Sequence, residues 1–329
     1  MGFDIYSMNK SFGNIRHPDY YSPLNDTLAW LDKNKSQMFF LWFHMSDPHN
    51  PYTPSDDKAC KYNESYCQFI RTNSMEEMEE RRGTMEDCQP NGISKWDLDL
   101  YQTLYDGEVN QVDENAGKII DKLKALGLDK NTIVVFLSDH GESFDHNYFF
   151  NHGLIVNHST IHIPLIIKNP LFKTENRKSD YLITHSDTSA TILDLLGFDP
   201  KTYHSEGMNY SNLFHNDIIS KLIYKPREQA FIINRDLSKY ALYDGRHKYI
   251  LSLSDACLYN RQTEELYDLS QDPNEINNLT KDLPEKTNTM KKTLLKYLLK
   301  YNLPRSSKNN TPPELDIQRL RETLKSMGY

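Results

Sequence analysis

The stretch LYDGEVNQVDENAGKIIDKLKALGLDKNTIVVFLSDHGES (residues 104–143) decides the fold, because it joins a long amphipathic helix directly to a buried strand. Apolar residues recur at three- and four-residue steps from Leu98 to Leu126, and Gly127 predicts the end of the helix. The apolar run at 132–138 then predicts a strand covered on both faces. A helix that leads straight into such a strand predicts an α/β fold.

Two further apolar runs, 38–44 and 161–167, predict strands of the same buried kind. Leu24, Leu28 and Leu31 predict a helix before the first strand, and SDTSATILDLLG (186–197) predicts another after the third, capped by Ser186 or Asp187. The expected architecture is therefore a mostly parallel sheet flanked by helices. The charged segment between the first two strands lacks an apolar period and is interpreted as an excursion or lid-like insertion.

The C-terminal region differs in character and predicts a small antiparallel α+β subdomain. Two apolar stretches flank Asp244-Gly245, a dipeptide suited to a tight type I′ hairpin turn. Helical patterns follow at 284–301 and 313–327. The predicted domains are a partial α/β domain at 1–215 with an insertion at about 56–92, the antiparallel subdomain with its helix at 216–302, and a linker with a terminal helix at 303–329.

Composition excludes some classes of partner. The 329 residues include 38 Lys and Arg against 46 Asp and Glu, a net charge of −8, which argues against nucleic acid binding. The longest apolar run, 38–43, is far shorter than the roughly 20 residues that a membrane span needs. The first twenty residues do not resemble a signal peptide, and the sequence leaves the compartment open.

The four cysteines (Cys60, Cys67, Cys88 and Cys257) do not follow a zinc-binding pattern. Zinc sites place two to four residues between paired cysteines, whereas six separate Cys60 from Cys67. Free thiols, or a local disulfide in an oxidising compartment, are the expected states.

Polar, histidine-bearing loops follow the predicted strands, where open α/β sheets place their ligands. One loop contains His49, the next Asp139 and His140, and a third His152. A carboxylate and an imidazole side by side can both bind one divalent cation, although two ligands do not complete a site. Taken singly, Asp139 is better interpreted as a cap or turn former than as a metal ligand, and His49, set between two prolines, as part of a rigid loop. A separate zinc site among the histidines from His140 to His162 is a weaker alternative, because their spacing is irregular.

With these residues in view, the chain resembles the sulfatase family of the alkaline-phosphatase superfamily over roughly positions 20–280. Five blocks carry the resemblance in the family's order, and the resemblance implies an alkaline-phosphatase-like α/β fold. These blocks are FFLWFHMSDPHNPY (39–52), the stretch at 104–143, FFNHGLIVNHSTIHIPLIIKNP (149–170), THSDTSATILDLLG (184–197) and ELYDLSQDPNEINNL (265–279).

The resemblance implies roles for four residues. Asp139 and His140 would bind a divalent cation, usually calcium in this family, with manganese, magnesium and zinc as alternatives. His49 and His152 would contact the ester, and one of them would protonate the leaving oxygen. The implied substrate is a small-molecule or glycan sulfate ester.

The chain also departs from the family pattern. Asp4 is not the family's paired aspartate after an apolar strand, and Cys88-Gln-Pro90 lacks the Ser and Arg of the nucleophile motif. No nucleophile is therefore identified, and His162 stands where the family has an Arg. The chain resembles the C-terminal portion of a sulfatase, so we expect it to require a missing N-terminal half and to show little turnover alone.

Two alternatives remain open at this point. The Asp-His pair also occurs in phosphonate and phosphate ester hydrolases and in phosphoethanolamine transferases of the same superfamily. A non-catalytic sulfatase-like binding module would keep the fold without the chemistry.

Overall fold

A computed structural model describes the chain in six ranges: residues 23–83, 92–170, 178–203, 205–214, 225–253 and 263–301. The sequence predictions for Asp4, Cys88, Cys257, the domain boundary at 215 and the helix at 313–327 lie outside the described residues.

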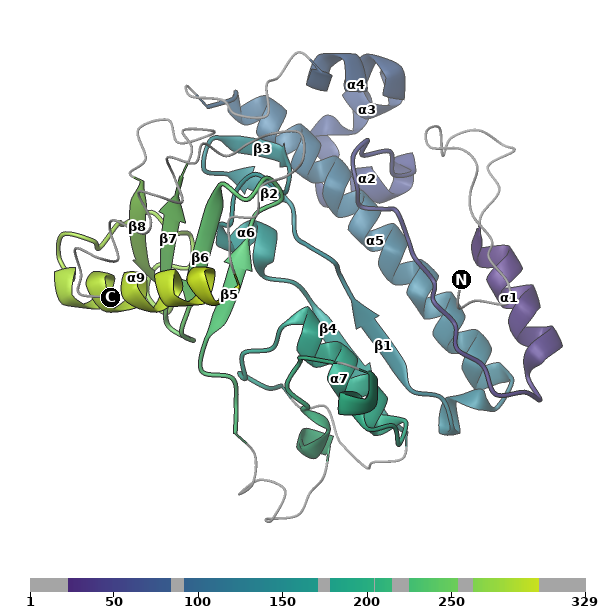
Figure 1. Cartoon of the computed structure of the whole chain (residues 1–329). Coiled ribbons are helices and arrows are strands. Elements are labelled where there is room, and N and C mark those ends of the chain that lie inside the picture. The colour runs from purple at the N-terminus through teal and green to yellow at the C-terminus, as the bar shows by residue number, and fades with distance from the viewer. Residues whose placement is uncertain are drawn as a thin grey trace. The chain divides into compact units, whose positions relative to one another are not determined.

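The chain forms two compact units, and the division runs through the middle of the sequence. The first contains the residues up to Val135, with Phe149–Asn151 and Ile167–Leu171; the second contains the remainder. Each unit is described separately below, with the element labels of Figure 1.

Two predicted helices of the first unit are confirmed, α1 (Pro23–Asn34) and α5 (Lys95–Ala125). The Ser94 hydroxyl caps α5 by accepting a hydrogen bond from Asp97 N at 3.0 Å. Gly127, with φ of 70°, adopts the left-handed conformation after the helix and leads into η2 (Leu128–Lys130). Apolar residues of α1, α5 and η2 form one core, which contains Leu31, Leu123 and Leu128.

The predicted strand at 38–44 is wrong as a strand, because the structure assigns neither helix nor strand to these residues. Successive side chains of this segment nevertheless alternate between packed and exposed positions. Phe39 and Leu41 pack against the α1–α5 core, whereas the side chains of Phe40 and Trp42 are about two-thirds exposed, at 65% and 66%. A strand is defined by hydrogen bonds to a neighbouring strand, and an apolar pattern alone does not supply that neighbour.

The other two predicted strands are present but shorter. They are β1 (Val134–Leu137) and β4 (Leu165–Lys168), which pair with each other. Of the predicted third strand, Ile161 instead ends α6 (His158–Ile161), a single helical turn, and residues 162–164 are neither helix nor strand. A second pair, β2 (Ser143–Asp145) and β3 (Tyr148–Asn151), was not predicted; it turns through His146 and Asn147, both at positive φ.

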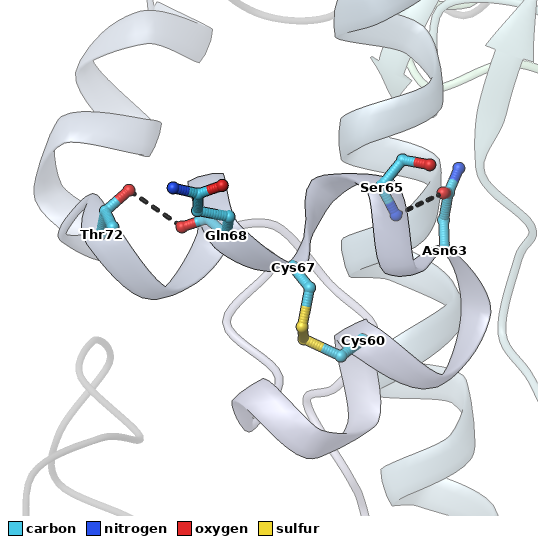
Figure 2. Close-up of a disulfide and its surroundings, with 6 residues drawn as sticks. All are labelled: Cys60, Asn63, Ser65, Cys67, Gln68 and Thr72. Atoms are coloured by element: carbon cyan, nitrogen blue, oxygen red, sulfur yellow. Dashed lines mark hydrogen bonds between the residues drawn. A yellow bond between two sulfur atoms is a disulfide. The ribbon is translucent and has the colours of Figure 1, made fainter.

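The charged segment that was interpreted as an insertion is helical where it is described. It contains α2 (Asp56–Tyr62), η1 (Glu64–Tyr66), α3 (Cys67–Thr72) and α4 (Met75–Gly83). A disulfide joins Cys60 to Cys67, in agreement with the local disulfide that the sequence allowed (Figure 2). Between the two cysteines, the Asn63 side chain accepts a hydrogen bond from Ser65 N at 3.1 Å, which caps η1 (Figure 2).

The predicted antiparallel sheet is confirmed in the C-terminal region. Its strands are β5 (Ala230–Ile233), β6 (Lys239–Tyr243), β7 (His247–Ser252) and β8 (Glu264–Asp268), in that spatial order. Helix α9 (Pro284–Lys300), also predicted, lies across one face (Figure 1). Tyr249 and Leu251 on that face pack with Leu294 and Leu298 of α9. The opposite face presents Ile250 to Val156.

The hairpin turn between β6 and β7 differs from the prediction by one residue. Asp244 N donates to His247 O at 3.1 Å, so the two central residues are Gly245 and Arg246. Gly245 has φ of 89°, and glycine at the first central position is typical of a type II′ turn, not the predicted type I′.

Helix α7 (His185–Leu195) confirms the predicted helix, but its cap lies earlier than predicted. Thr184 is the N-cap, and Asp187 completes a capping box from the third helical position. Asp187 is also fully buried and pairs with Arg227, so its role exceeds capping. Two 3₁₀ turns follow, η3 (Pro200–Tyr203) and η4 (Ser211–Phe214). No helix within the described ranges combines the length and hydrophobicity needed to span a bilayer.

Candidate functional site

The loop that follows β1 is fixed by backbone packing. Gly141 N donates to Thr160 O at 2.9 Å, and a Cβ at position 141 would lie 2.1 Å from Ser159 O. Only glycine therefore fits at this point. The close approach holds Asp139 and His140 in a defined place at the end of the strand.

Asp139 and His140 face each other as a potential chelating pair. The Nδ1 atom of His140 lies 2.9 Å from Gly141 O and must donate to it, because a carbonyl oxygen only accepts. This hydrogen bond leaves Nε2 as the basic nitrogen, and Nε2 lies 3.5 Å from Asp139 Oδ2. The Asp139 side chain is 71% exposed, so an ion in solution can reach the pair.

His152 comes from a separate loop and stacks on His140. The ring centroids are 3.7 Å apart and the rings are inclined by 24°. The Nδ1 atom of His152 lies 3.3 Å from Glu142 Oε1, and the Glu142 side chain is almost fully buried. The structure therefore brings together three of the four predicted site residues: Asp139, His140 and His152.

Sequence reasoning missed Glu142 and His185 as parts of this site. Glu142 orients the His152 ring, and its position directly after Asp139-His140-Gly141 was the available signal. His185, at the start of α7, places Nε2 3.0 Å from Ser138 O and thereby contacts the same loop. No local pattern links His185 to residue 138, because the contact spans 47 positions.

His49, the fourth predicted residue, belongs to the first unit, whereas the other three belong to the second. Its loop contains two cis peptide bonds, Asp47–Pro48 and Asn50–Pro51, and α5 supports it through Gln111, whose Nε2 donates to Asp47 Oδ2 at 3.0 Å. Burial raises the pKa of Asp47, and the Gln111 hydrogen bond only partly opposes this. That His49 contacts the same ester remains a prediction.

The donor set fits part of a cation site. The pair of Asp139 Oδ2 and His140 Nε2 supplies an oxygen and a nitrogen ligand, and the Nδ1 hydrogen bond of His140 orients the ring. Among the residues that the structure describes, no three His, Cys, Asp or Glu side chains group closely enough to hold a metal ion. The described part of the chain thus contains two candidate ligands, Asp139 and His140, and shows neither a complete site nor the separate zinc site considered above.

The remaining histidines of this region contact other side chains of the protein. His158 and His162 stack with ring centroids 4.5 Å apart. Burial lowers the pKa of His158, and His162 and Lys248 lower it further, against the opposing charges of Glu275 and Asp145. The Nδ1 atom of His146 lies 2.6 Å from Asp145 Oδ1. These contacts favour structural roles over metal binding.

Two protein-family models match the chain. The model named Sulfatase matches residues 5–198, and the model named N-sulphoglucosamine sulphohydrolase, C-terminal, matches residues 144–302. Together the two models cover residues 5–302, which include the antiparallel sheet and α9.

Curated relatives agree with these matches. An endo-4-O-sulfatase of Bacteroides thetaiotaomicron is 27% identical over 82% of the chain and 54% of its own length. Arylsulfatase K of Rattus norvegicus is 25% identical over 81% of the chain and 50% of its own length. The chain thus spans about half the length of these relatives.

Solved structures share the fold. A Bacteroides thetaiotaomicron protein described with the metabolism of multiple glycosaminoglycans superposes with a TM-score of 0.65 at 22% identity, covering 85% of this chain and 59% of its own. A structure solved with D-glucosamine-2-N,6-O-disulfate as substrate gives 0.51 at 22% identity, covering 76% and 49%. The predicted alkaline-phosphatase-like α/β class is confirmed by these likenesses.

Proposed function

Because the chain belongs to the sulfatase family, we propose that it contributes part of the active site of an enzyme that hydrolyses sulfate esters. The observation that carries the proposal is the grouping of Asp139, His140 and His152 at the end of β1. A cation-binding pair directly beside an imidazole is the arrangement that cleavage of an anionic ester needs.

Each residue has a distinct role in this proposal. Asp139 Oδ2 and His140 Nε2 would hold a divalent cation, whose positive charge would polarise the sulfuryl oxygens. His152 would donate a proton to the leaving oxygen through Nε2, because Nδ1 faces Glu142. The Glu142 carboxylate would fix the orientation of the ring. His49 would also contact the ester.

We assign calcium as the cation and a sulfated glycan as the substrate class. The carboxylate of Asp139 favours a hard divalent ion, and the His140 nitrogen leaves manganese, magnesium and zinc as outcomes of the test. The glycan assignment is supported by the relative named endo-4-O-sulfatase and by the neighbour solved with a disulfated glucosamine.

The first test measures cation binding by isothermal titration and by thermal unfolding. Calcium at about 100 times its dissociation constant should stabilise the folded chain by about 2.7 kcal/mol. Asp139→Ala should abolish both the heat of binding and the stabilisation. The matched control is Asp180→Ala, an exposed carboxylate outside the site, and it should bind calcium as the unaltered chain does.

The second test measures the sulfate released from a sulfated disaccharide and an aryl sulfate, and the alcohol released from a phosphate diester and a phosphonate ester. The chain alone should release little product, because no nucleophile is identified and no three potential ligands group together among the described residues. Any turnover should favour the sulfate esters and be lost in His152→Ala. Preference for the phosphate diester would overturn the assignment of the ester, and absence of cation binding would overturn the catalytic proposal.

A further inference from the structure

The loop that begins at His152 (residues 152–157) accepts hydrogen bonds from several other elements. Its carbonyl groups accept hydrogen bonds from the Tyr148 hydroxyl (His152 O, 2.7 Å), Arg235 N (Gly153 O, 2.9 Å), Asn234 Nδ2 (Leu154 O, 2.9 Å) and Lys248 Nζ (Val156 O, 2.7 Å). Three of these four donors belong to the C-terminal sheet or to its first hairpin. The sheet is therefore tied directly to the loop that begins at His152.

A buried ion pair completes this attachment. Lys248 on β7 and Glu275, in the turn between β8 and α9, contact each other, and both side chains are fully buried. Glu275 Oε2 also accepts from Asn157 Nδ2 at 2.8 Å and from His158 N at 2.9 Å. Lys248 thus binds a carbonyl of the loop, while Glu275 binds two of its N–H groups.

The turn that carries Glu275 is itself fixed. Glu275 has φ of 55°, an uncommon conformation for a residue with a side chain. The carboxylate of Asp272 accepts hydrogen bonds from Ile276 N at 2.9 Å and Asn277 N at 2.8 Å, which closes the turn around Glu275. The Glu275 carboxylate is consequently directed inward by local geometry as well as by its partners.

We propose that Lys248 and Glu275 are positioning residues for His152, and that the C-terminal sheet acts on the candidate site through them. A buried ion pair is weak support for stability by itself, since apolar replacement of both partners is often neutral. This pair is specific, however, in where it holds the loop, because Val156 O, Asn157 Nδ2 and His158 N all bond to its two side chains. That the position of His152 matters for catalysis rests on the proposed function.

The experiment compares amide hydrogen exchange and the ring NMR signals of His152 in the full chain and in Lys248→Met. We expect exchange of the Asn157 side-chain amide and the His158 backbone amide, which both donate to Glu275, to accelerate about ten- to a hundredfold. The reason is that the Glu275 carboxylate loses the Lys248 charge that holds it in place. The His152 ring signals should shift, since stacking on His140 depends on the loop. Lys286→Met, which removes the partly exposed pair with Asp244, should change neither.

A double variant, Lys248→Met with Glu275→Met, separates positioning from stability and serves if the single variant does not fold. It leaves no unpaired buried charge, so its unfolding midpoint should recover towards that of the unaltered chain. The loop amides should still exchange fast and the His152 signals should stay shifted. If these signals return to their original values together with the midpoint, or if they never move in Lys248→Met, the proposal is overturned.

These measurements use neither cation nor substrate. A chain that fails to bind calcium but shows the His152 shift would defeat the proposed function and leave the positioning intact. The reverse result, calcium binding without any effect of Lys248→Met on His152, would defeat only the positioning.

Discussion

The C-terminal sheet and the segment 38–42 are both apolar, but they differ in how they bury their side chains. In the sheet, Tyr249 and Leu251 face α9 while Ile250 faces Val156, so successive residues of β7 are covered on opposite sides. In segment 38–42, Phe39 and Leu41 are packed, whereas Met38, Phe40 and Trp42 are exposed. Leu137 of β1 and Ile166 of β4 are exposed as well.

This difference shows that the C-terminal region supplies, from its own sequence, the helix that covers its sheet. Strands β5–β8 and helix α9 are contiguous in sequence, and together they form the two layers that bury a sheet face. The described residues provide segment 38–42 with one covered side only. The same alternation of apolar residues therefore gives a closed core in one region and an exposed apolar face in the other.

Truncation of the α9 core should produce the largest effect. Leu294→Ala removes a side chain that is 1% exposed and should lower the free energy of unfolding by about 2–5 kcal/mol. Urea denaturation followed by fluorescence measures the change. The matched variant, Leu31→Ala in the α1–α5 core, should cost less because its neighbours Trp30 and Phe39 are only partly buried. An equal or larger cost for Leu31→Ala would remove the contrast between the regions.

Loss of the Cys60–Cys67 disulfide should produce the next largest effect. The bridge closes a short loop, so Cys60→Ser with Cys67→Ser should destabilise the chain by about 2–3 kcal/mol. Thermal unfolding with and without reductant checks the value. The double variant should be insensitive to reductant, and persistence of a reductant effect would place the sensitivity elsewhere in the chain.

The pH dependence of stability should report on His158, beside the face of the C-terminal sheet that carries Lys248. Its pKa is lowered from about 6.5 in the fold, so the unfolded chain binds a proton more readily. The contribution of neutral His158 to the free energy of unfolding is therefore complete above about pH 6.5. It is lost as the pH falls from there through the lowered pKa of His158 in the folded chain. His158→Gln should flatten this part of the stability profile. An unchanged slope below pH 6.5 would show that other groups dominate.

Substitution on the exposed face should have the smallest effect on stability and a larger effect on association. Trp42→Ser should change the free energy of unfolding by no more than about 0.5 kcal/mol, because the ring is 66% exposed. Light scattering should show reduced self-association, since an exposed apolar patch is removed. Leu41→Ser, one residue away on the packed side, should destabilise instead. Similar effects of the two variants would mean that the alternation has no energetic consequence.

The sequence predicted well the elements whose stabilising contacts are local. Helices α1, α5, α7 and α9 follow from apolar periods and terminal residues such as Gly127, because a helix closes its own hydrogen bonds. The β6–β7 hairpin follows from Asp244-Gly245 to within one residue. The Asp139-His140 pair was identifiable because both residues leave the same strand end.

Long-range contacts decided the remainder. The apolar run at 38–44 does not reveal that it forms no strand. Helix α6, which was not predicted, begins where His158 N donates to Glu275, more than a hundred residues later in the sequence. The stacking of His152 on His140 and the buried Lys248–Glu275 pair likewise join distant segments. By itself the sequence determined the fold class, the helices α1, α5, α7 and α9, and the choice of Asp139 and His140 as candidate cation ligands. Only the tertiary structure decided which of them meet, because packing and buried charge depend on neighbours that local periodicity does not encode.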